Sequence, residues 1–237
     1  MLNLLSEPNV HSDKWTQLIE TSHQTSLFVL PEWLDLFRDK LAVAVVEDSA
    51  GRWRAGVVAQ LSPEAIPFYQ YAGLLLTRRE DPAAVHMLLE WLEEKHPGAV
   101  VVNSPALVDV RPFTWRSMKS GALWVDRIRY TMFTDKSSRP FPDMPAPAAT
   151  ESPDLTGLME LHDSLGVLQA SGVTWGVDAQ NRAYILAASP GSEGVVWDIC
   201  QKHPTTDLLG CNSPGMNRRK RVFGARLRTY YEMRHVK

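Results

Sequence analysis

The sequence predicts an α/β fold in which strands alternate with helices along two successive halves of the chain. Three observations lead to this prediction. Apolar residues recur at helical spacing in several segments, short runs rich in valine, alanine and aromatic residues lie between them, and a proline-rich stretch divides the 237 residues. We expect an N-terminal half at residues 1–136, a linker at 137–153 and a shorter C-terminal half at 154–237.

The N-terminal half begins with a helical segment, Asp13–Leu41, in which Trp15, Leu18 and Ile19 share one face. A short break is expected at His23–Ser26. Two strands should follow as a hairpin, because turn-forming residues separate two apolar runs. The expected strands are Leu41–Glu47, Trp53–Leu61 and, as a third, Pro67–Leu76.

A helix should begin at Asp81-Pro82, an N-cap followed by proline at the first helical position, and end before Pro97-Gly98. The rest of this half is read as a buried strand Ala99–Asn103, a turn or short helix Val108–Met118 and a long strand Leu123–Thr134.

The linker contains five prolines between Lys136 and Pro153, a density that neither a helix nor a central strand tolerates. After it we expect helices at Asp154–Leu165, Gly194–Lys202 and Met216–Phe223, and strands at Val173–Val177, Ala183–Ala188, Thr206–Gly210 and Arg226–Arg234.

Composition narrows the class of protein. Hydrophobic residues make up 44% and charged residues 22%, both ordinary for a globular protein. No apolar run approaches the roughly 20 residues needed to cross a bilayer, and the N-terminus lacks the features of a secretory signal. We therefore expect a cytoplasmic protein without membrane insertion. The two cysteines imply no disulfide framework, and the scattered histidines predict no metal site.

Charge is distributed unevenly along the chain. From Pro214 to Lys237 there are eight Lys or Arg against one acid, so this segment carries +7 and the remainder −9. Such a segment can bind phosphates, and nucleic-acid binding is one reading of it. The acidic remainder and the lack of a recognised nucleic-acid motif argue against a nucleic-acid partner, and a tRNA-linked acyl donor is the alternative that stays open.

Four stretches resemble the FemAB-like, CelD-type acyltransferases of the GNAT superfamily. They are Trp15 with Ser26-Leu27-Phe28 and Pro31-Glu32-Trp33-Leu34; Asn103-Ser104-Pro105 with Asp109, Arg111-Pro112-Phe113 and Trp115; Arg129-Tyr130-Thr131; and Asp207–Gly210 with Arg219–Ala225 and Tyr230-Tyr231. Together they cover residues 13–136 and about 180–235.

The resemblance implies two tandem GNAT-like halves, each a mixed sheet with flanking helices, the second half truncated. Two departures support the truncation. The basic helix that follows the "RYT" strand in the family is replaced by Ser138-Arg139-Pro140-Phe141-Pro142, and the region before Val173 is compressed.

The function that the resemblance implies is N-acyl transfer. The acyl group, acetyl or aminoacyl, would move to an amine of a sugar, a peptide or a small metabolite. Acyl-CoA would serve as a co-substrate, with no tightly bound cofactor. The sequence lacks the glycine-rich motif that binds the phosphates of acetyl-CoA in GNAT enzymes. Its local analogue, Pro190–Gly194, is interpreted as a turn and helix cap. The cofactor-binding residues are therefore unknown.

The resemblance places two candidate catalytic residues. Lys220 matches the family lysine associated with substrate or transition-state contacts, and a solvated basic helix face is the alternative. Asp207, at the end of a strand, could act as a base or orient the amine, or could simply be a turn residue.

Five further residues are candidate substrate-binding residues. For Asp109 and Arg111 the favoured alternative is a structural salt bridge that fixes the loop. Tyr230 and Tyr231 alternate across a strand, so one of them should belong to the core, and Arg219 replaces the family's phenylalanine. The cleft between the halves is the expected site. The competing hypothesis is a degenerate, non-catalytic relative that binds a ligand or a protein partner.

Overall fold

The computed structural model describes residues 1–62, 66, 71–107, 109–121, 123–135, 137–138, 167–189, 191–210, 212 and 214–236. The chain forms two compact units. Unit 1 comprises Met1–Ile128 and Tyr230–Lys237, and unit 2 comprises Arg129–Thr229. Two long strands, β6 (Leu123–Asp135) and β11 (Arg226–Val236), contribute residues to both units. The expected linker at 137–153 lies almost wholly outside the described residues.

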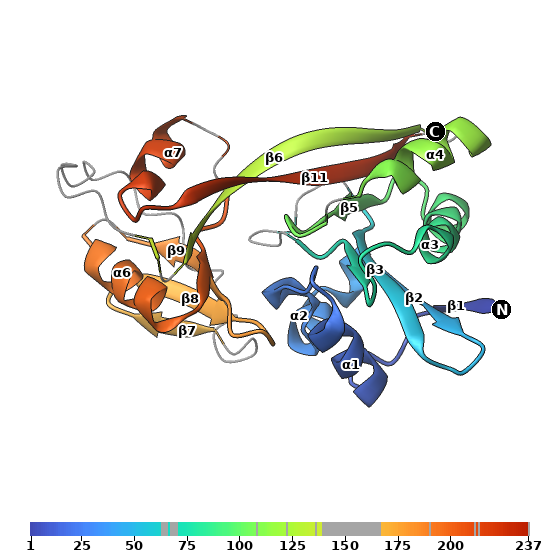
Figure 1. Ribbon diagram of the computed structural model, residues 1–237, viewed down its shortest axis with the longest axis horizontal. Coiled ribbons are helices and arrows are strands. Elements are labelled where there is room, and N and C mark those ends of the chain that lie inside the picture. The colour runs from blue at the N-terminus through green and yellow to red at the C-terminus, as the bar shows by residue number, and fades with distance from the viewer. Residues whose placement is uncertain are drawn as a thin grey trace. The chain divides into compact units, whose positions relative to one another are not determined.

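Unit 1 is built on an antiparallel sheet (Figure 1). Its first strands are β1 (Leu2–Ser6), β2 (Leu41–Asp48), β3 (Trp53–Gln60), β4 (Leu74–Leu76) and β5 (Val100–Val102). The strand order is β1-β2-β3-β5-β11, with β4 also paired to β3. The expected hairpin is confirmed as β2 and β3, whereas β1 was not expected. Of the expected strand Pro67–Leu76, only the last three residues are a strand within the described residues.

The helical segment that precedes the hairpin is broken, as expected, after its first helix. It consists of α1 (Asp13–Thr21), a 3-10 turn η1 (Leu27–Val29), α2 (Pro31–Leu36) and a second 3-10 turn η2 (Arg38–Lys40). Two hydrogen bonds from side chains to distant backbone carbonyls fix the position of the break. The Trp15 indole donates to the Val29 carbonyl at 3.0 Å, and the Ser26 hydroxyl donates to the Tyr71 carbonyl at 2.5 Å. The first family-like stretch is thus accounted for by packing.

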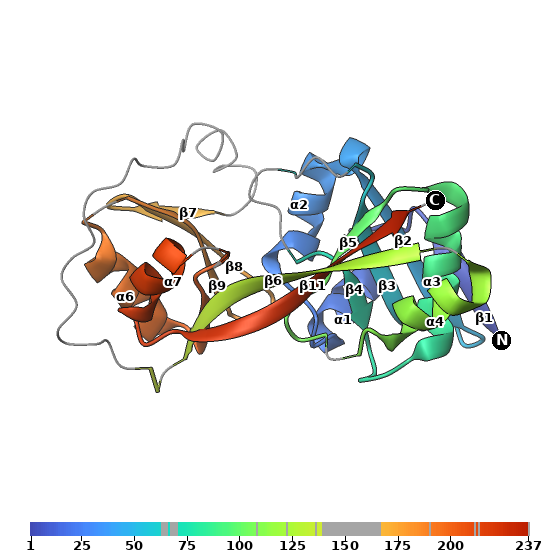
Figure 2. The ribbon, with the colours of Figure 1, turned by 90° about the horizontal axis from the view of Figure 1, so that it is seen from above.

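Helices α3 (Pro82–Lys95) and α4 (Arg111–Ser120) lie side by side (Figure 2). Asp81 caps α3 as the sequence predicts, since its carboxylate accepts the Ala84 N–H at 3.3 Å. The segment expected as a turn or short helix at Val108–Met118 is α4, which begins three residues later. Gly121 ends it with φ of 72°.

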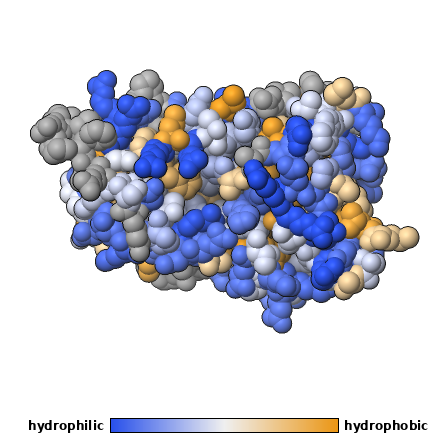
Figure 3. Space-filling model, in the orientation of Figure 1, coloured by the Kyte–Doolittle hydropathy of each residue, from blue (hydrophilic) through white to orange (hydrophobic). Residues whose placement is uncertain are grey.

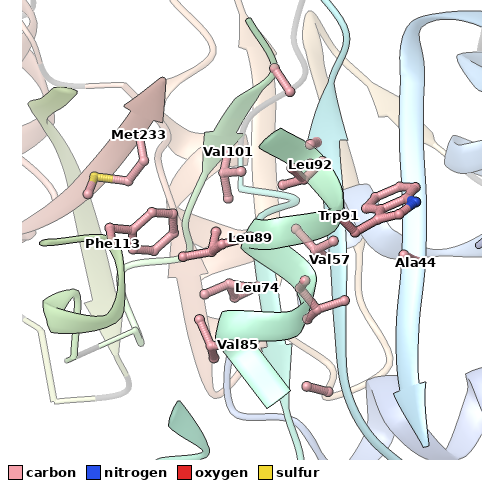
Figure 4. Close-up of a cluster of buried hydrophobic side chains, with 14 of the residues drawn as sticks. Ala44, Val57, Leu74, Val85, Leu89, Trp91, Leu92, Val101, Phe113 and Met233 are labelled. Carbon is pink, nitrogen blue, oxygen red and sulfur yellow. The ribbon is translucent and has the colours of Figure 1, made fainter. Parts of the chain in front are cut away.

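The main core of unit 1 lies between α3 and one face of the sheet. Alternation decides which face: Ala55, Val57 and Ala59 of β3 belong to this core, while Gly56 faces α1, where an added Cβ would lie 3.0 Å from Leu18 Cδ2. Figure 4 shows α3 directing its leucines toward the sheet, beside Phe113 of α4 and Met233 of β11.

Unit 2 is a mixed sheet with helices packed on it. In strand order it contains β6, β10 (Thr205–Asp207), β9 (Ala183–Ala188), β8 (Val173–Val177) and β7 (Leu168–Ala170). Strands β9 and β10 are parallel and are joined through α6 (Glu193–Lys202), and α7 (Pro214–Arg221) precedes β11. The structure confirms most of the elements expected here. Strand β7 was not expected, β10 ends three residues early, and the helix expected at Asp154–Leu165 lies outside the described residues.

Within the residues that the structure describes, no helix has the length and apolar character to cross a bilayer. On the face drawn in Figure 3, hydrophobic residues form small separate patches in a mainly hydrophilic surface.

Candidate functional site

The parallel strands of unit 2 end at an irregular edge. Strand β10 pairs with β9 only through Thr206 opposite Ala183 and Asp207 opposite Tyr184. Strand β9 runs on to Ala188, so four of its residues extend past the last β10 partner. Ligands of open α/β sheets bind outside the carboxyl ends of parallel strands, which makes this edge the candidate site.

A β-bulge lies in β9 at the same place. The register with β8 passes from Ala187 opposite Thr174 to Ile185 opposite Trp175, which leaves Leu186 as the extra residue. A bulge bends its strand and disrupts the local ladder, and bulges occur often beside active sites. Past Tyr184, the backbone groups of β9 that point away from β8 therefore have no β10 residue opposite them in the described chain.

The chain turns sharply where β10 ends. Leu208 still donates its N–H to the Met132 carbonyl of β6 at 2.9 Å, but Leu209 adopts the left-handed conformation with φ of 54°. This conformation is unfavourable for a branched side chain and persists only where its surroundings enforce it.

Asp207 holds this turn from inside the sheet. Its side chain is fully buried, and Oδ1 accepts the Leu209 N–H at 2.7 Å and the Thr131 hydroxyl of β6 at 2.6 Å. Thr131 is also fully buried. The carboxylate thus ties β6, β10 and the turn together.

Lys220 holds the same turn from α7. Its Nζ donates to the carbonyl oxygens of Leu208 at 2.5 Å, of Leu209, and of Gly210 at 2.5 Å. An ammonium group has three N–H donors, and these three acceptors match them. The structure therefore brings the two candidate catalytic residues to one turn, residues 207–210, in which Asp207 accepts a backbone N–H and Lys220 donates to three backbone carbonyls.

The other five candidates do not join that turn. Arg219 is exposed on α7, next to Lys220 in sequence but turned toward solvent. Tyr230 is 4% exposed and makes an edge contact with Tyr71, their ring centroids 4.8 Å apart, so it is the core member of the tyrosine pair. Tyr231 is partly buried against the core of unit 1.

Asp109 and Arg111 form a forked salt bridge in unit 1. Arg111 Nε lies 2.7 Å and Nη2 2.9 Å from the two Asp109 oxygens, and Arg111 N–H also donates to Asp109 at 3.0 Å. The fork lowers the pKa of Asp109 and raises that of Arg111. These contacts fix the start of α4, which is the structural alternative that the sequence left open.

Solved structures are similar to this chain over most of its length at low sequence identity. A GCN5-related N-acetyltransferase from Sphaerobacter thermophilus shares 12% identity, with 98% of this chain and 95% of that chain covered and a TM-score of 0.45. A GNAT-family acetyltransferase from Colwellia psychrerythraea shares 8%, with 99% and 100% covered and a TM-score of 0.47. A probable N-acyltransferase from Enterococcus faecalis V583 shares 10%, with 100% and 73% covered and a TM-score of 0.41.

No protein-family model matches the sequence, and no curated protein matches it.

Sequence reasoning missed a buried polar network beside the turn. Asp178 accepts from Arg182 Nε at 2.7 Å and from the Tyr184 hydroxyl at 2.8 Å. Burial raises the pKa of Tyr184 well above its usual value, and the adjacent Asp178 raises it further, so the phenol stays protonated. The sequence feature that could have indicated this network is Asp178 in the Asp-Ala-Gln-Asn turn before β9. From the sequence alone, this turn is expected only to connect two strands.

Within its described residues, the analogue of a phosphate cradle forms the expected turn but not the expected side-chain cap. Ser192 N–H donates to the Ser189 carbonyl at 3.2 Å, its hydroxyl donates to the same oxygen at 2.5 Å, and Gly191 has φ of 85°. The Ser192 side chain therefore caps no α6 N–H and is committed to the turn.

Proposed function

We propose that the protein is an N-acyltransferase that takes an acyl group from a thioester and transfers it to an amine, with the edge of β9 and β10 as its site. One observation carries the proposal: β9 bulges at Leu186 where β10 ends, so backbone N–H and C=O groups of β9 have no β10 residue opposite them in the part of the chain that the structure describes. An extended donor arm that contains amides can complete this ladder as a strand would. The sequence resemblance to FemAB-like acyltransferases supports the same activity.

The reaction joins the amine nitrogen to the acyl carbon. The nitrogen lone pair attacks the thioester carbonyl, the C–S bond breaks, the nitrogen loses a proton and the leaving thiolate gains one. The enzyme must align the two substrates and place donors against the oxyanion that develops. Backbone N–H groups of β9 past Tyr184 are suited to that second task.

Asp207 and Lys220 serve this site as positioning residues. Asp207 is buried and Lys220 donates to three carbonyls, so both shape the turn that borders the donor arm. Together they hold Leu209 in its strained conformation, of the kind that clusters at active sites. We propose acyl-CoA as the donor and an amine of a sugar, peptide or small metabolite as the acceptor.

Binding of the donor is the first test. Calorimetry and thermal unfolding would be measured with acetyl-CoA and with longer acyl-CoAs. At about 100 times its dissociation constant, a ligand of the folded state stabilises it by about 2.7 kcal/mol. Turnover would then be followed by mass spectrometry of acylated amines, which avoids interference from protein thiols.

Substitutions at two adjacent residues of α7 distinguish an effect on the proposed site from a general effect on the helix. Lys220→Met removes the donors to the turn, whereas Arg221→Met changes an exposed residue of the same helix. We expect Lys220→Met to weaken donor binding or turnover at least about tenfold and Arg221→Met to leave both unchanged. If the two variants had the same donor binding and turnover, the proposed location of the site would be wrong.

The second candidate function is a non-catalytic binding protein. It is favoured by the burial of Asp207 and by the engagement of Lys220 with backbone carbonyls, which leave neither residue in position to contact a substrate directly. Absence of binding by every acyl-CoA and of turnover with every amine would favour this function over transfer.

A further inference from the structure

A cavity of about 250 Å³ is lined by residues of unit 1, whereas the strand edge just described belongs to unit 2. One wall is a single face of α1, from which Lys14 and Leu18 project, and the other walls come from the β2–β3 turn, the start of β3 and the residues after β4. Pockets for drug-sized ligands measure roughly 300–1,000 Å³, so this cavity is suited to a smaller molecule.

The walls carry four cationic side chains. These are Lys14, Arg52, Arg54 and Arg78, and Asp48 is the carboxylate that lines the cavity with them. Leu18 and Trp53 add apolar surface. Such a combination of fixed cations and an apolar wall recognises a small organic anion.

Three of the cations are held in place by carboxylates. Arg52 contacts Asp48 through Nε at 3.0 Å and Nη2 at 2.8 Å, and Arg54 Nη2 lies 2.5 Å from Asp81. Each guanidinium has five N–H donors, so each keeps donors beyond those that its carboxylate uses.

Lys14 is the third cation held in this way. Its Nζ lies 3.6 Å from Glu47 and 5.9 Å from the centre of the Trp53 ring. Because these cations are already positioned, a ligand need not order them on binding, which favours affinity.

Arg78 differs from the other three. It is exposed, and among the described residues no carboxylate lies within ion-pair distance of it. With Glu47 and Asp81 counted beside the lining residues, four cations face three carboxylates, a local charge of +1. A carboxylate would neutralise this charge, and the more negative phosphate monoester would more than offset it.

We propose that this cavity binds a small organic oxyanion, a carboxylate or a phosphate monoester, with Arg78 as its principal charge partner and Leu18 and Trp53 against its hydrocarbon part. This binding function is separate from the proposed acyl transfer and does not depend on it. The shared chemistry is a planar or tetrahedral oxyanion that guanidinium groups bind through paired N–H donors.

The test uses the full chain with benzoate and phenyl phosphate as probes, titrated by calorimetry. We expect at least one probe to bind with a dissociation constant below about 1 mM. Preference for benzoate assigns a carboxylate ligand, and preference for phenyl phosphate assigns a phosphate ester.

Two adjacent arginines provide the control. Arg78 lines the cavity and Arg79, equally exposed, does not. Arg78→Ala should weaken probe binding about tenfold or more, and Arg79→Ala should leave it unchanged. Failure of both probes to bind, or equal weakening by both substitutions, overturns the proposal.

Discussion

Gly73 lies where two stretches of backbone approach too closely for any side chain. A Cβ at this position would lie 2.7 Å from the Asn103 Cα and 2.8 Å from the Val102 carbonyl oxygen. The neighbouring atoms are backbone and cannot move aside as a flexible side chain would. We predict that Gly73→Ala lowers the free energy of unfolding by about 1–3 kcal/mol, measured by urea denaturation.

Gly194 is the control for this substitution. It lies in α6, and apart from its chain neighbours and the nearby helix backbone no atom lies within 4 Å of an added Cβ, so Gly194→Ala should raise the free energy of unfolding by about 0.5–1 kcal/mol. If both substitutions changed the free energy of unfolding in the same direction, this account of Gly73 would be contradicted.

Asp48 gives unit 1 a predictable response to acid. Its hydrogen bond with the Arg52 side chain, together with backbone N–H donors, lowers its pKa from 3.8 to about 2. A carboxyl whose pKa is lower in the folded state contributes stability above its unfolded pKa and loses that contribution as pH falls through the folded pKa. Stability that depends on Asp48 should therefore be complete above about pH 4 and lost toward pH 2.

The Asp48→Asn variant isolates this contribution. Its unfolding temperature should lie below that of the unchanged protein at pH 6, and the difference should shrink as the pH approaches 2. Scanning calorimetry across this range checks the prediction, and a difference that stays constant with pH would contradict it.

At the scale of elements, Asp81 joins two functions at the start of α3. Oδ1 caps the helix at Ala84 and Oδ2 pairs with Arg54. Asp81→Asn keeps the cap and removes the charge, whereas Asp81→Ala removes both. We predict that Asp81→Ala lowers the free energy of unfolding by about 1–2 kcal/mol more than Asp81→Asn does, measured by chemical denaturation. Equal losses of unfolding free energy in the two variants would mean that the ion pair with Arg54, and not the helix cap, stabilises this region.

The elements predicted from sequence are those with strong local signals. The Asp81-Pro82 start and the hairpin at β2 and β3 carry their own caps and turn residues, so their prediction needed no tertiary contacts. Strands β1 and β7 are short and largely exposed, with no buried alternation to reveal them. The bulge at Leu186 could not be predicted, because it is defined by the register with β8 rather than by β9 alone.

The same distinction applies to the candidate site. Asp207 and Lys220 were found through their place in a family-like motif, and the structure brings them to one turn. Their partner Thr131 was part of another motif, but its contact with Asp207 joins residues 76 positions apart. The catalytic roles of Asp207 and Lys220 remain predictions, as do the substrate-binding roles of the other candidates.

At the scale of the whole molecule, one structural unit contains residues from both ends of the chain. The last residues of the chain, from Tyr230 onward, belong to unit 1, while Arg129–Thr229 form unit 2. A proline-rich segment is a local signal, whereas the return of β11 to unit 1 depends on pairing with β5, in which Met233 lies opposite Val101. Nothing local in the sequence indicates that pairing.

The return of β11 makes unit 1 dependent on its final strand. Tyr230, Met233 and His235 are buried at 4%, 3% and 6% exposure, and Met233 belongs to the main core. Removing residues 230–237 would leave β5 without this partner and open the core, at a cost of several buried side chains of about 2–5 kcal/mol each. This exceeds the margin of a typical domain, so we predict that unit 1 loses its cooperative fold.

Deletion of residues 1–6 is the matched truncation, because it removes the edge strand β1 of the same sheet, whereas β11 lies between β5 and β6. Leu2 and Leu4 are only partly buried, and β2 keeps its pairing with β3, so the loss should be about 2 kcal/mol. Hydrogen exchange of β2, β3 and α3 distinguishes the two variants. We expect protection to survive the N-terminal deletion and to disappear after the C-terminal one. Retained protection in both variants would mean that unit 1 folds without β11, contrary to the pairing seen here.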